Sequence, residues 1–230
     1  AERLARRLHA RGFAPIVAPC IEIAFCLEAL RQAAREIPDD ADLLFTSANG
    51  VRALAAAADL QALAAGRRVF AVGEKTRHVC AAHGLDALAP RAQASQEGLW
   101  ALFEEVGFPN RLWFFRAREG RDWLVERLRD RGVQVRLVPA YEVRCARDPR
   151  PVREGLRMRP DVVLVASRKT AECLMMLAGE ALDAARASAF VAISENAARP
   201  LAERGLEVAF PPSPVSVEAM LDWWLEKGGG

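Results

Sequence analysis

Short runs of apolar residues alternate with stretches of helical periodicity along most of the chain. The apolar runs predict buried strands at 13–18, 42–46, 68–72, 112–115, 133–138, 162–166 and 189–193. The stretches between them predict helices at 2–10, 48–58, 75–83, 96–105, 121–131, 170–178, 197–204 and 217–227. This alternation is typical of an α/β fold in which helices cover both faces of a parallel sheet.

The sequence also repeats itself at a nearly constant spacing. Pairs recur first at an offset of 120 residues and, after a one-residue slip, at 121. Examples are Arg11-Gly12 with Arg131-Gly132, Ser47 with Ser167, Glu74 with Glu195, and Ser95 with Ser216. Coincidence does not keep an offset nearly constant from residue 11 to residue 218. We therefore infer a duplicated unit and expect two similar lobes with a ligand-binding cleft between them.

The duplication predicts a strand ahead of the first residue. In the second copy, the apolar run 111–116 precedes the predicted helix 121–131, whereas the first copy begins directly with the matching helix. We therefore expect roughly ten or more further residues before Ala1 in the natural protein, and a strand among them.

Two segments at equivalent positions of the copies differ from the buried runs. Residues 19–24 and 139–144 each begin with a proline and then alternate apolar and polar side chains. This pattern is typical of a half-exposed strand. The two segments would pair with each other as a ribbon between the lobes, or each would be an ordinary edge strand of its own lobe.

Polar residues follow several of the predicted strands, where open parallel sheets bind ligands. They are Ser47-Ala48-Asn49, Gly73 to Thr76, Ser167-Arg168-Lys169 and Ser194-Glu195. The simplest interpretation is that each hydroxyl or amide caps the helix that follows. Together, however, several helix N-termini at this edge would provide backbone N–H groups for a ligand with several carboxylates or phosphates.

Charge and composition exclude several classes of protein. The formal net charge is +2, with 32 basic and 30 acidic side chains, which argues against nucleic acid as the main partner. No apolar run is long enough for a membrane helix. The five cysteines are scattered, without a CxxC motif, so we expect neither disulfides nor a zinc site, and a cytoplasmic location. The three histidines form no ligand motif, and we expect no metal.

Motifs of covalent catalysis and nucleotide binding are missing from the sequence: no GxSxG, Walker or GxGxxG pattern occurs. Arg116, Arg118 and Arg121 follow a predicted strand, where they would meet an anion or remain solvated. Tyr141, the only tyrosine, lies in one of the two half-exposed strands. Its phenol would act as a proton donor over the cleft, or it would be a packing residue at a hinge.

Several motifs, in their order along the chain, resemble those of uroporphyrinogen-III synthases. The stretch 43–51, LLFTSANGV, looks like the family's FTSxxGV signature, and 71–76, AVGEKT, followed by Gly84-Leu85, resembles its AVGxxT…GL segment. Residues 128–141 are similar to its LxxxGxxVxxxxxY stretch. Residues 192–195 with 205–206, and the loop 211–216, resemble its last third. The family often has a Thr pair where this chain has Asn196-Ala197.

The resemblance implies two flavodoxin-like α/β lobes with parallel sheets, one of them discontinuous in sequence, joined by a two-stranded β-ladder. Residues 26–138 would form one lobe. Residues 1–19 and 146–230 would form the other, and 20–25 with 139–145 would be the linker strands.

The resemblance also implies the reaction. Family members cyclise hydroxymethylbilane, a linear tetrapyrrole with eight carboxylates, to uroporphyrinogen III, with loss of water and inversion of the last pyrrole ring. No cofactor is used, and we expect a monomer. Tyr141 matches the family's candidate proton donor. The residues that we expect to bind the substrate are Ser47, Ala48, Asn49, Gly73, Thr76, Ser95, Arg116, Ser167, Arg168, Lys169, Ser194, Glu195 and Ser216.

Two other classes of function fit part of this pattern. One is a non-catalytic binding module, such as a synthase-like sensory domain fused to a regulator, which would bind a polyanionic ligand. A DNA-binding helix-turn-helix beyond the termini would favour it. The other is a two-lobed anion receptor for transport, which would require a signal peptide, whereas residues 1–12 predict an amphipathic helix.

Overall fold

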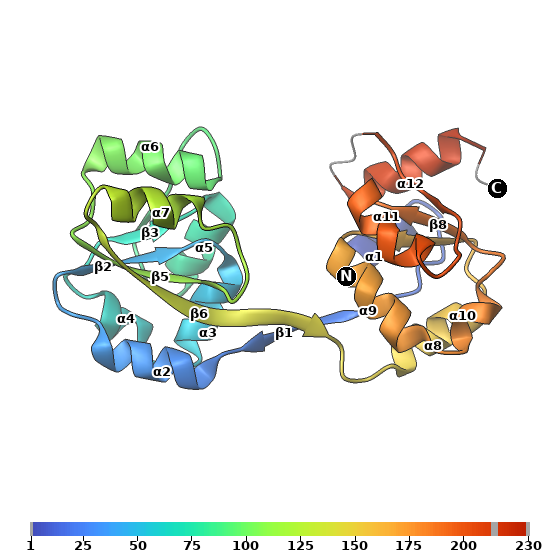
Figure 1. Cartoon of the computed structure of the whole chain (residues 1–230), viewed down its shortest axis with the longest axis horizontal. Helices are drawn as coiled ribbons and strands as arrows, with labels where there is room; N and C mark the ends of the chain where they lie inside the picture. Colours follow the sequence, from blue (N-terminus) through green and yellow to red (C-terminus); the bar gives the residue numbers. More distant parts are fainter. Residues whose placement is uncertain (1, 213–215, 229–230) are drawn as a thin grey trace. The chain divides into compact units, whose positions relative to one another are not determined.

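The computed structural model describes residues 2–212 and 216–228 and divides the chain into two compact units. The larger unit is Ile23–Val143, and the smaller one combines Ala1–Glu22 with Arg144–Gly230. The chain passes from one unit to the other twice, within strands β1 (Ile21–Phe25) and β6 (Gln134–Cys145) (Figure 1). Both passages fall in the segments that the sequence analysis set apart as linker strands.

The larger unit is built on a six-stranded sheet of order β1-β6-β5-β2-β3-β4. Its centre is β2 (Ala41–Phe45), which pairs in parallel with β5 (Arg111–Ala117) and β3 (Val69–Ala71). The short β4 (Ala87–Leu88) forms one edge. All five residues of β2 are buried, which explains its continuous apolar run.

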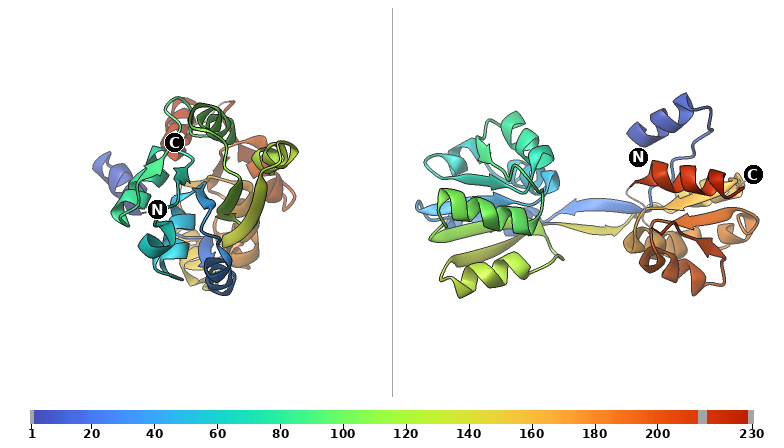
Figure 2. Two further views of the ribbon diagram at one scale, coloured as in Figure 1. Left: turned by 90° about the vertical axis from the view of Figure 1, so that its left-hand side faces the viewer. Right: turned by 90° about the horizontal axis from the view of Figure 1, so that it is seen from above.

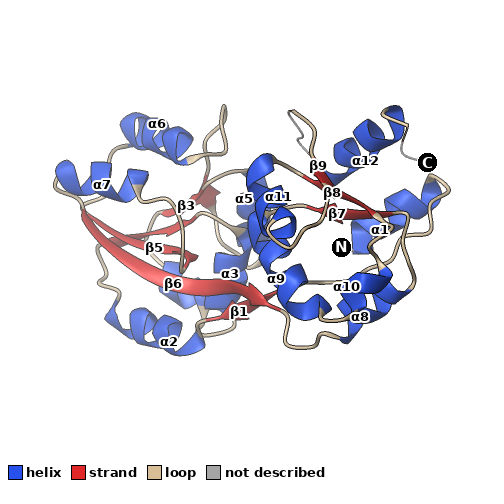
Figure 3. Ribbon diagram, turned by 45° about the vertical axis from the view of Figure 1, so that its right-hand side comes forward, coloured by secondary structure: helices blue, strands red, loops and turns tan. Residues whose placement is uncertain are grey.

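Helices cover both faces of this sheet (Figure 3). One face packs against α2 (Leu27–Glu36), α3 (Ala48–Ala55), α4 (Leu60–Ala64) and α5 (Glu74–Ala82). The other packs against α6 (Gln96–Val106) and α7 (Trp123–Asp130). Because side chains alternate along a strand, Leu43 and Phe45 belong to the first core and Leu44 to the second.

The smaller unit has a parallel sheet of three strands, β7 (Val162–Val165), β8 (Ala189–Ala192) and β9 (Val208–Ala209), in the order β7-β8-β9. This order matches β2-β3-β4 of the larger unit. Its helices are α8 (Arg150–Arg157), α9 (Arg168–Ala178), α10 (Ala181–Ala184), α11 (Glu195–Ala202), α12 (Val217–Glu226) and α1 (Glu2–Ala10). An ion pair of 2.7 Å between Arg7 and Glu218 connects α1 to α12.

The predicted strand Phe13–Ala18 is wrong: this segment has no regular structure, and Ile16 and Val17 are 38% and 42% exposed. In the larger unit the equivalent residues are the start of β6, which pairs with β5. The described residues of the smaller unit include no counterpart of β5. Without a neighbouring strand the segment has no partner for its backbone hydrogen bonds, and the smaller sheet stays at three strands.

The hypothesis that the two half-exposed segments pair with each other is confirmed (Figure 2). The Cys26 N–H donates to the Ala140 carbonyl at 3.0 Å, and the Ala146 N–H donates to the Cys20 carbonyl at 2.9 Å, which is an antiparallel arrangement. β1 is at the same time an edge strand of the six-stranded sheet, and β6 runs without interruption from the buried segment into the ladder.

The prediction that the chain has no disulfide is wrong. Cys145, the last residue of β6, is bonded to Cys173 in α9, with 5.0 Å between the Cα atoms. The two cysteines are 28 residues apart, and the packing of α9 against the end of the ladder brings them together. Sequence spacing carries no signal for such a pair.

No helix within residues 2–212 and 216–228 is both long and apolar enough to cross a lipid bilayer.

Candidate functional site

Strand register aligns several candidate residues at the carboxyl edge of the larger sheet. Phe45 pairs with both Ala71 and Phe115, so Ser47, Gly73 and Ala117 each lie two residues beyond that row. Ala117 pairs with Tyr141, which follows an irregularity in the β5–β6 register. The parallel strands therefore bring Ser47, Gly73 and Tyr141 to one edge, where this fold class binds ligands.

The serines at this edge are helix caps, as their simplest interpretation predicted. The Ser47 hydroxyl accepts the Gly50 N–H at 3.2 Å at the start of α3, and the Ser95 hydroxyl accepts the Gly98 N–H at 3.1 Å at the start of α6. A capping hydroxyl uses its oxygen as acceptor and keeps its own hydrogen, which it can donate to a ligand.

Ala48 and Asn49 occupy the first turn of α3. Ala48 is buried, so it can offer a ligand only its backbone N–H. The Asn49 amide oxygen lies 3.5 Å from the Arg52 guanidinium.

The start of α5 differs from the capped helices. Gly73 occupies the N-cap position and offers no side-chain cap, and Thr76 follows three residues later with only 4% of its surface exposed. A Cβ atom on Gly73 would lie 2.5 Å from the Cβ of Ala94, so the loop before α6 passes directly over this residue.

The smaller unit repeats the arrangement at its own carboxyl edge. Val165 pairs with Ala192, which places Ser167 and Ser194 two residues beyond that row. Ser167 accepts the Thr170 N–H at 3.1 Å, and Ser194 accepts the Ala197 N–H at 3.4 Å. Ser216 caps α12 in the same way, by accepting the Ala219 N–H at 3.1 Å. The neighbouring residues 213–215 of the predicted loop lie outside the described part of the chain.

The charged candidates of the smaller unit are all solvent-accessible. Arg168 donates to Glu172 at 2.9 Å and to the Asn196 amide oxygen at 3.4 Å, so the starts of α9 and α11 lie close together. Lys169 is exposed and has no ion pair among the described residues, and Glu195 is exposed as well. Lys169 is therefore the cation of this group that remains free to meet a carboxylate.

Arg116 is engaged by the chain itself. Its side chain is 10% exposed, and its guanidinium donates to the carbonyls of Gly120 at 2.9 Å and Arg121 at 3.0 Å. It also forms an ion pair of 2.7 Å with Asp122. These contacts hold the loop between β5 and α7 in place and leave few donors for a ligand.

Tyr141 is 8% exposed and packs in the core beneath α2, α3 and α5. Its hydroxyl has no hydrogen-bond partner among the described residues, yet it is not among their fully buried, unsatisfied polar atoms. The phenol thus packs its ring into the core and keeps an unengaged hydroxyl at the carboxyl edge.

Arg118, two positions after Arg116, is another of the arginines that the sequence analysis noted at this strand end. It is exposed, donates to the Glu142 carboxylate at 3.0 Å, and lies 3.6 Å from the Cys26 sulfur. The Cys26 sulfur, and then the Glu142 carboxylate, raise the pKa of the Arg118 guanidinium. Its backbone N–H donates to the Tyr141 carbonyl at 2.8 Å, which continues the pairing of β5 with β6, whereas its guanidinium contacts Glu142 and Cys26. The only signal for it in the sequence is its place after a strand.

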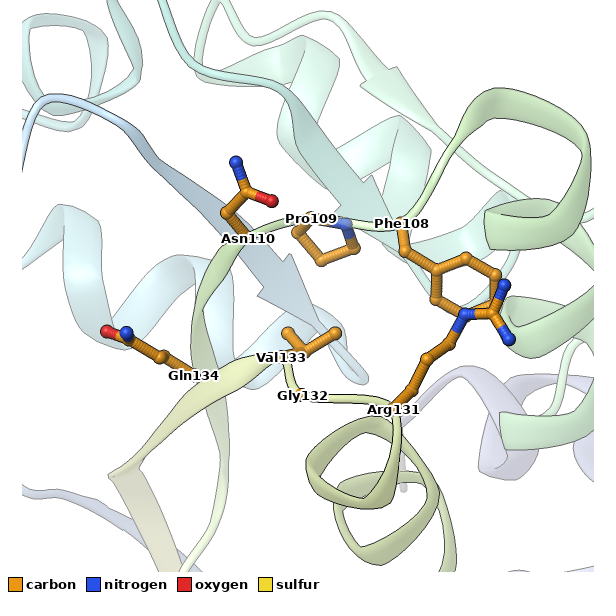
Figure 4. Close-up of a pocket in the computed structure, with 7 residues that line it drawn as sticks. All are labelled: Phe108, Pro109, Asn110, Arg131, Gly132, Val133 and Gln134. Atoms are coloured by element: carbon orange, nitrogen blue, oxygen red, sulfur yellow. The ribbon is translucent and has the colours of Figure 1, made fainter.

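A surface pocket of the larger unit lies elsewhere. It is lined by residues 108–110 and 131–134, at the amino ends of β5 and β6, with the Arg131 guanidinium 4.1 Å from the Phe108 ring centre (Figure 4). No predicted site residue belongs to it. Across the described ranges, no group of three or more His, Cys, Asp or Glu side chains is placed to hold a metal ion. The predicted cleft between the lobes stays a prediction.

Comparison with known proteins identifies what the chain is similar to. A family model described as uroporphyrinogen-III synthase HemD matches residues 2–222. No curated protein matches. Among solved structures, a mutant uroporphyrinogen III synthase from the extremely thermophilic bacterium Thermus thermophilus is 21% identical, with a TM-score of 0.52 over 98% of this chain and 92% of that one. Uroporphyrinogen-III synthetase from Helicobacter pylori 26695 is 18% identical, with a TM-score of 0.60 over 94% and 96%. At these identities the two structures support the fold.

Proposed function

The chain belongs to the uroporphyrinogen-III synthase family, so its reaction is the cyclisation of hydroxymethylbilane to uroporphyrinogen III in haem biosynthesis, and we propose how its residues carry that reaction out. The observation that carries this conclusion is the match of the family model to residues 2–222. The helix N-termini at the two carboxyl edges offer backbone N–H groups, which can bind the carboxylates of such a substrate.

The substrate loses its terminal hydroxyl as water with the help of electrons from the pyrrole nitrogen. The resulting azafulvene carbon is attacked by the substituted position of the last ring. The spiro intermediate then fragments and recloses with that ring inverted. The substrate also cyclises unaided to the uninverted isomer, so the enzyme acts mainly by holding the carboxylate arms in one geometry.

The helix N-termini are the proposed binding sites for the carboxylate arms of the substrate. The hydroxyls of Ser47, Ser95, Ser167, Ser194 and Ser216, and the N–H groups around Ala48, Asn49, Gly73 and Glu195, donate to acetate and propionate groups. Arg168 and Lys169 add positive charge at the start of α9, with Lys169 the less engaged of the two. Thr76 belongs to the start of α5. Arg116 acts as a positioning residue, because its donors are already used to hold the β5–α7 loop.

Tyr141 is the proposed proton donor to the departing hydroxyl. A phenol whose hydroxyl has no partner in the described structure can present its proton to a leaving group, and water leaves more readily than hydroxide. The exposed Arg118 guanidinium, whose backbone N–H is bonded to the Tyr141 carbonyl, is proposed to meet negative charge of the substrate at the same sheet edge.

A product analysis tests the reaction. Freshly generated hydroxymethylbilane is supplied to the folded chain, the products are oxidised, and isomers I and III are separated. Isomer III in excess over a protein-free control is the expected result. Isomer I alone would contradict catalysis, and tight binding of the substrate without turnover would favour a sensory module.

A monomeric state and a cytoplasmic location complete the proposal. Light scattering on a size-exclusion column checks the first. For the second, Cys20, Cys26 and Cys80 are free, as expected in a reducing compartment, whereas the Cys145–Cys173 disulfide is not typical of one. Cell fractionation followed by immunodetection of the protein checks the location.

A further inference from the structure

The ladder formed by β1 and β6 has one apolar face. The two backbone hydrogen bonds that join the strands set their register, which places Ile23 opposite Val143 and Phe25 opposite Tyr141. Opposed residues of an antiparallel pair share a face, and so do residues two apart along one strand. These four side chains therefore belong to one face of the ladder, within the larger unit.

The other face of the ladder is polar, and its charged groups are paired with one another. The Arg144 guanidinium donates to the Glu22 carboxylate at 2.6 Å, and the Arg118 guanidinium donates to the Glu142 carboxylate at 3.0 Å. A ribbon of this kind normally buries its apolar face and leaves its polar face in water.

The apolar face is open in its middle. Ile23, Phe25 and Val143 are 39%, 38% and 37% exposed, and none of them belongs to a hydrophobic core of the described chain. Both ends of this face are covered, because Tyr141 belongs to a core of the larger unit and Ile21 packs against the core of the smaller one. The exposed apolar surface is thus confined to the ladder and adjoins Tyr141, and exposed apolar surface of this kind marks a binding site.

We propose that Ile23, Phe25 and Val143 contact the pyrrole rings of the substrate, next to Tyr141. This inference rests on the proposed function and deepens it. That function assigns the carboxylate arms to helix N-termini, whereas the rings and the methylene bridges between them carry no charge. Contact with the rings removes apolar surface of both partners from water, and the proposed proton donor lies at the end of the same face.

Ile23→Thr combined with Val143→Thr tests this contact. Threonine keeps a branched side chain suited to a strand and adds a hydroxyl that would lie against the rings without a partner. The probe is uroporphyrin III, a stable tetrapyrrole with eight carboxylates, and its Kd is measured by fluorescence titration. We expect the Kd to rise about tenfold in the double variant. A Kd within about twofold of the wild-type value would overturn the proposal.

The chain offers a matched control for one of these changes. Val106, the last residue of α6, is 36% exposed and lies outside the ladder. Val143→Thr is expected to raise the Kd about threefold, whereas Val106→Thr should leave it unchanged. The exchange Ile23→Val with Val143→Ile keeps the apolar surface and should keep the wild-type Kd. An equal rise of the Kd with Val106→Thr would overturn the proposal.

Two other roles of this face predict different results. A cross-strand pair of Ile23 and Val143 that serves only to stabilise the ladder predicts a lower melting temperature of the double threonine variant with an unchanged Kd. A face that binds a second copy of the chain predicts a wild-type dimer and a monomeric double variant by light scattering. Either result would overturn the proposal. Contact with the rings predicts instead a less negative heat-capacity change of uroporphyrin III binding in the double variant, measured by titration calorimetry.

Formation of isomer III by the wild type separates failure of this inference from failure of the proposed function. If the double variant binds uroporphyrin III more weakly but the wild type forms no isomer III, the ring contact is supported and the catalytic function is contradicted. If the wild type forms isomer III and all variants bind uroporphyrin III equally, the function is supported and the ring contact is contradicted. No binding of uroporphyrin III by the wild type would contradict the ring contact as well.

Discussion

At the scale of single residues, two side chains at the same sheet edge have opposite relations to their surroundings. Arg116 directs its donors to the carbonyls of its own loop, whereas the Tyr141 hydroxyl has no partner in the described chain. The sequence placed both residues near strand ends but could not distinguish them. The difference depends on the loop after β5, whose Gly120 and Arg121 carbonyls accept hydrogen bonds from the Arg116 guanidinium.

Tyr141→Phe is expected to lower kcat by about 100-fold or more, the usual effect of losing a general acid, and to leave the melting temperature unchanged. The ring remains in the core, and the hydroxyl that is lost makes no bond to the described residues. Single-turnover kinetics and thermal unfolding check the two halves of this prediction. Unchanged turnover would return Tyr141 to the role of a packing residue at a hinge.

Arg116→Met is expected to destabilise the larger unit by about 2 kcal/mol or more, since it removes charged hydrogen bonds to the carbonyls of Gly120 and Arg121 from a mostly buried position. Arg118→Met, in the same loop, is the matched control. It removes an exposed ion pair and is expected to cost less than about 1 kcal/mol. Urea unfolding of both variants makes the comparison. Equal losses would mean that burial of Arg116 does not strengthen its contacts.

At the scale of elements, an apolar run correctly predicted a strand where neighbouring strands are present to pair with it. The run at 42–46 predicted a central strand, and β2 lies between two parallel partners. The run at 13–18 has the same character, but the structure gives it no partner. The short helices α4 and α10, and the two-residue strands β4 and β9, were not predicted, because so few residues show no measurable periodicity. The longer helices α2 and α8, of 10 and 8 residues, were missed as well.

The disulfide joins two of these elements, the end of β6 and the middle of α9. Closing a loop with a sequence separation of 28 residues is expected to stabilise the oxidised chain by about 3–4 kcal/mol. Urea unfolding with and without a reductant measures this difference, and the double variant Cys145→Ser with Cys173→Ser should show none. If the reductant shifts wild type and double variant equally, the pair does not stabilise the fold.

At the scale of the whole molecule, the duplication predicted much of the architecture. The matching orders β2-β3-β4 and β7-β8-β9, and the serines that cap helices at both carboxyl edges, follow from one repeated unit. The repeat could not show which of its positions have changed role. Ser194 caps a helix, whereas Gly73 at the equivalent position leaves one open, and the reason is the approach of Ala94 from a distant loop.

The units should therefore differ in local stability, because β2 and β7 are equivalent strands in unequal surroundings. β2 is buried throughout and paired on both sides, whereas β7 is an edge strand in which Val162, Val163 and Leu164 are only partly buried. Backbone groups on an open edge are protected only by local packing. Hydrogen–deuterium exchange is expected to label the β7 peptides at least tenfold faster than those of β2. Equal protection would contradict the prediction that the open edge lowers the local stability of β7.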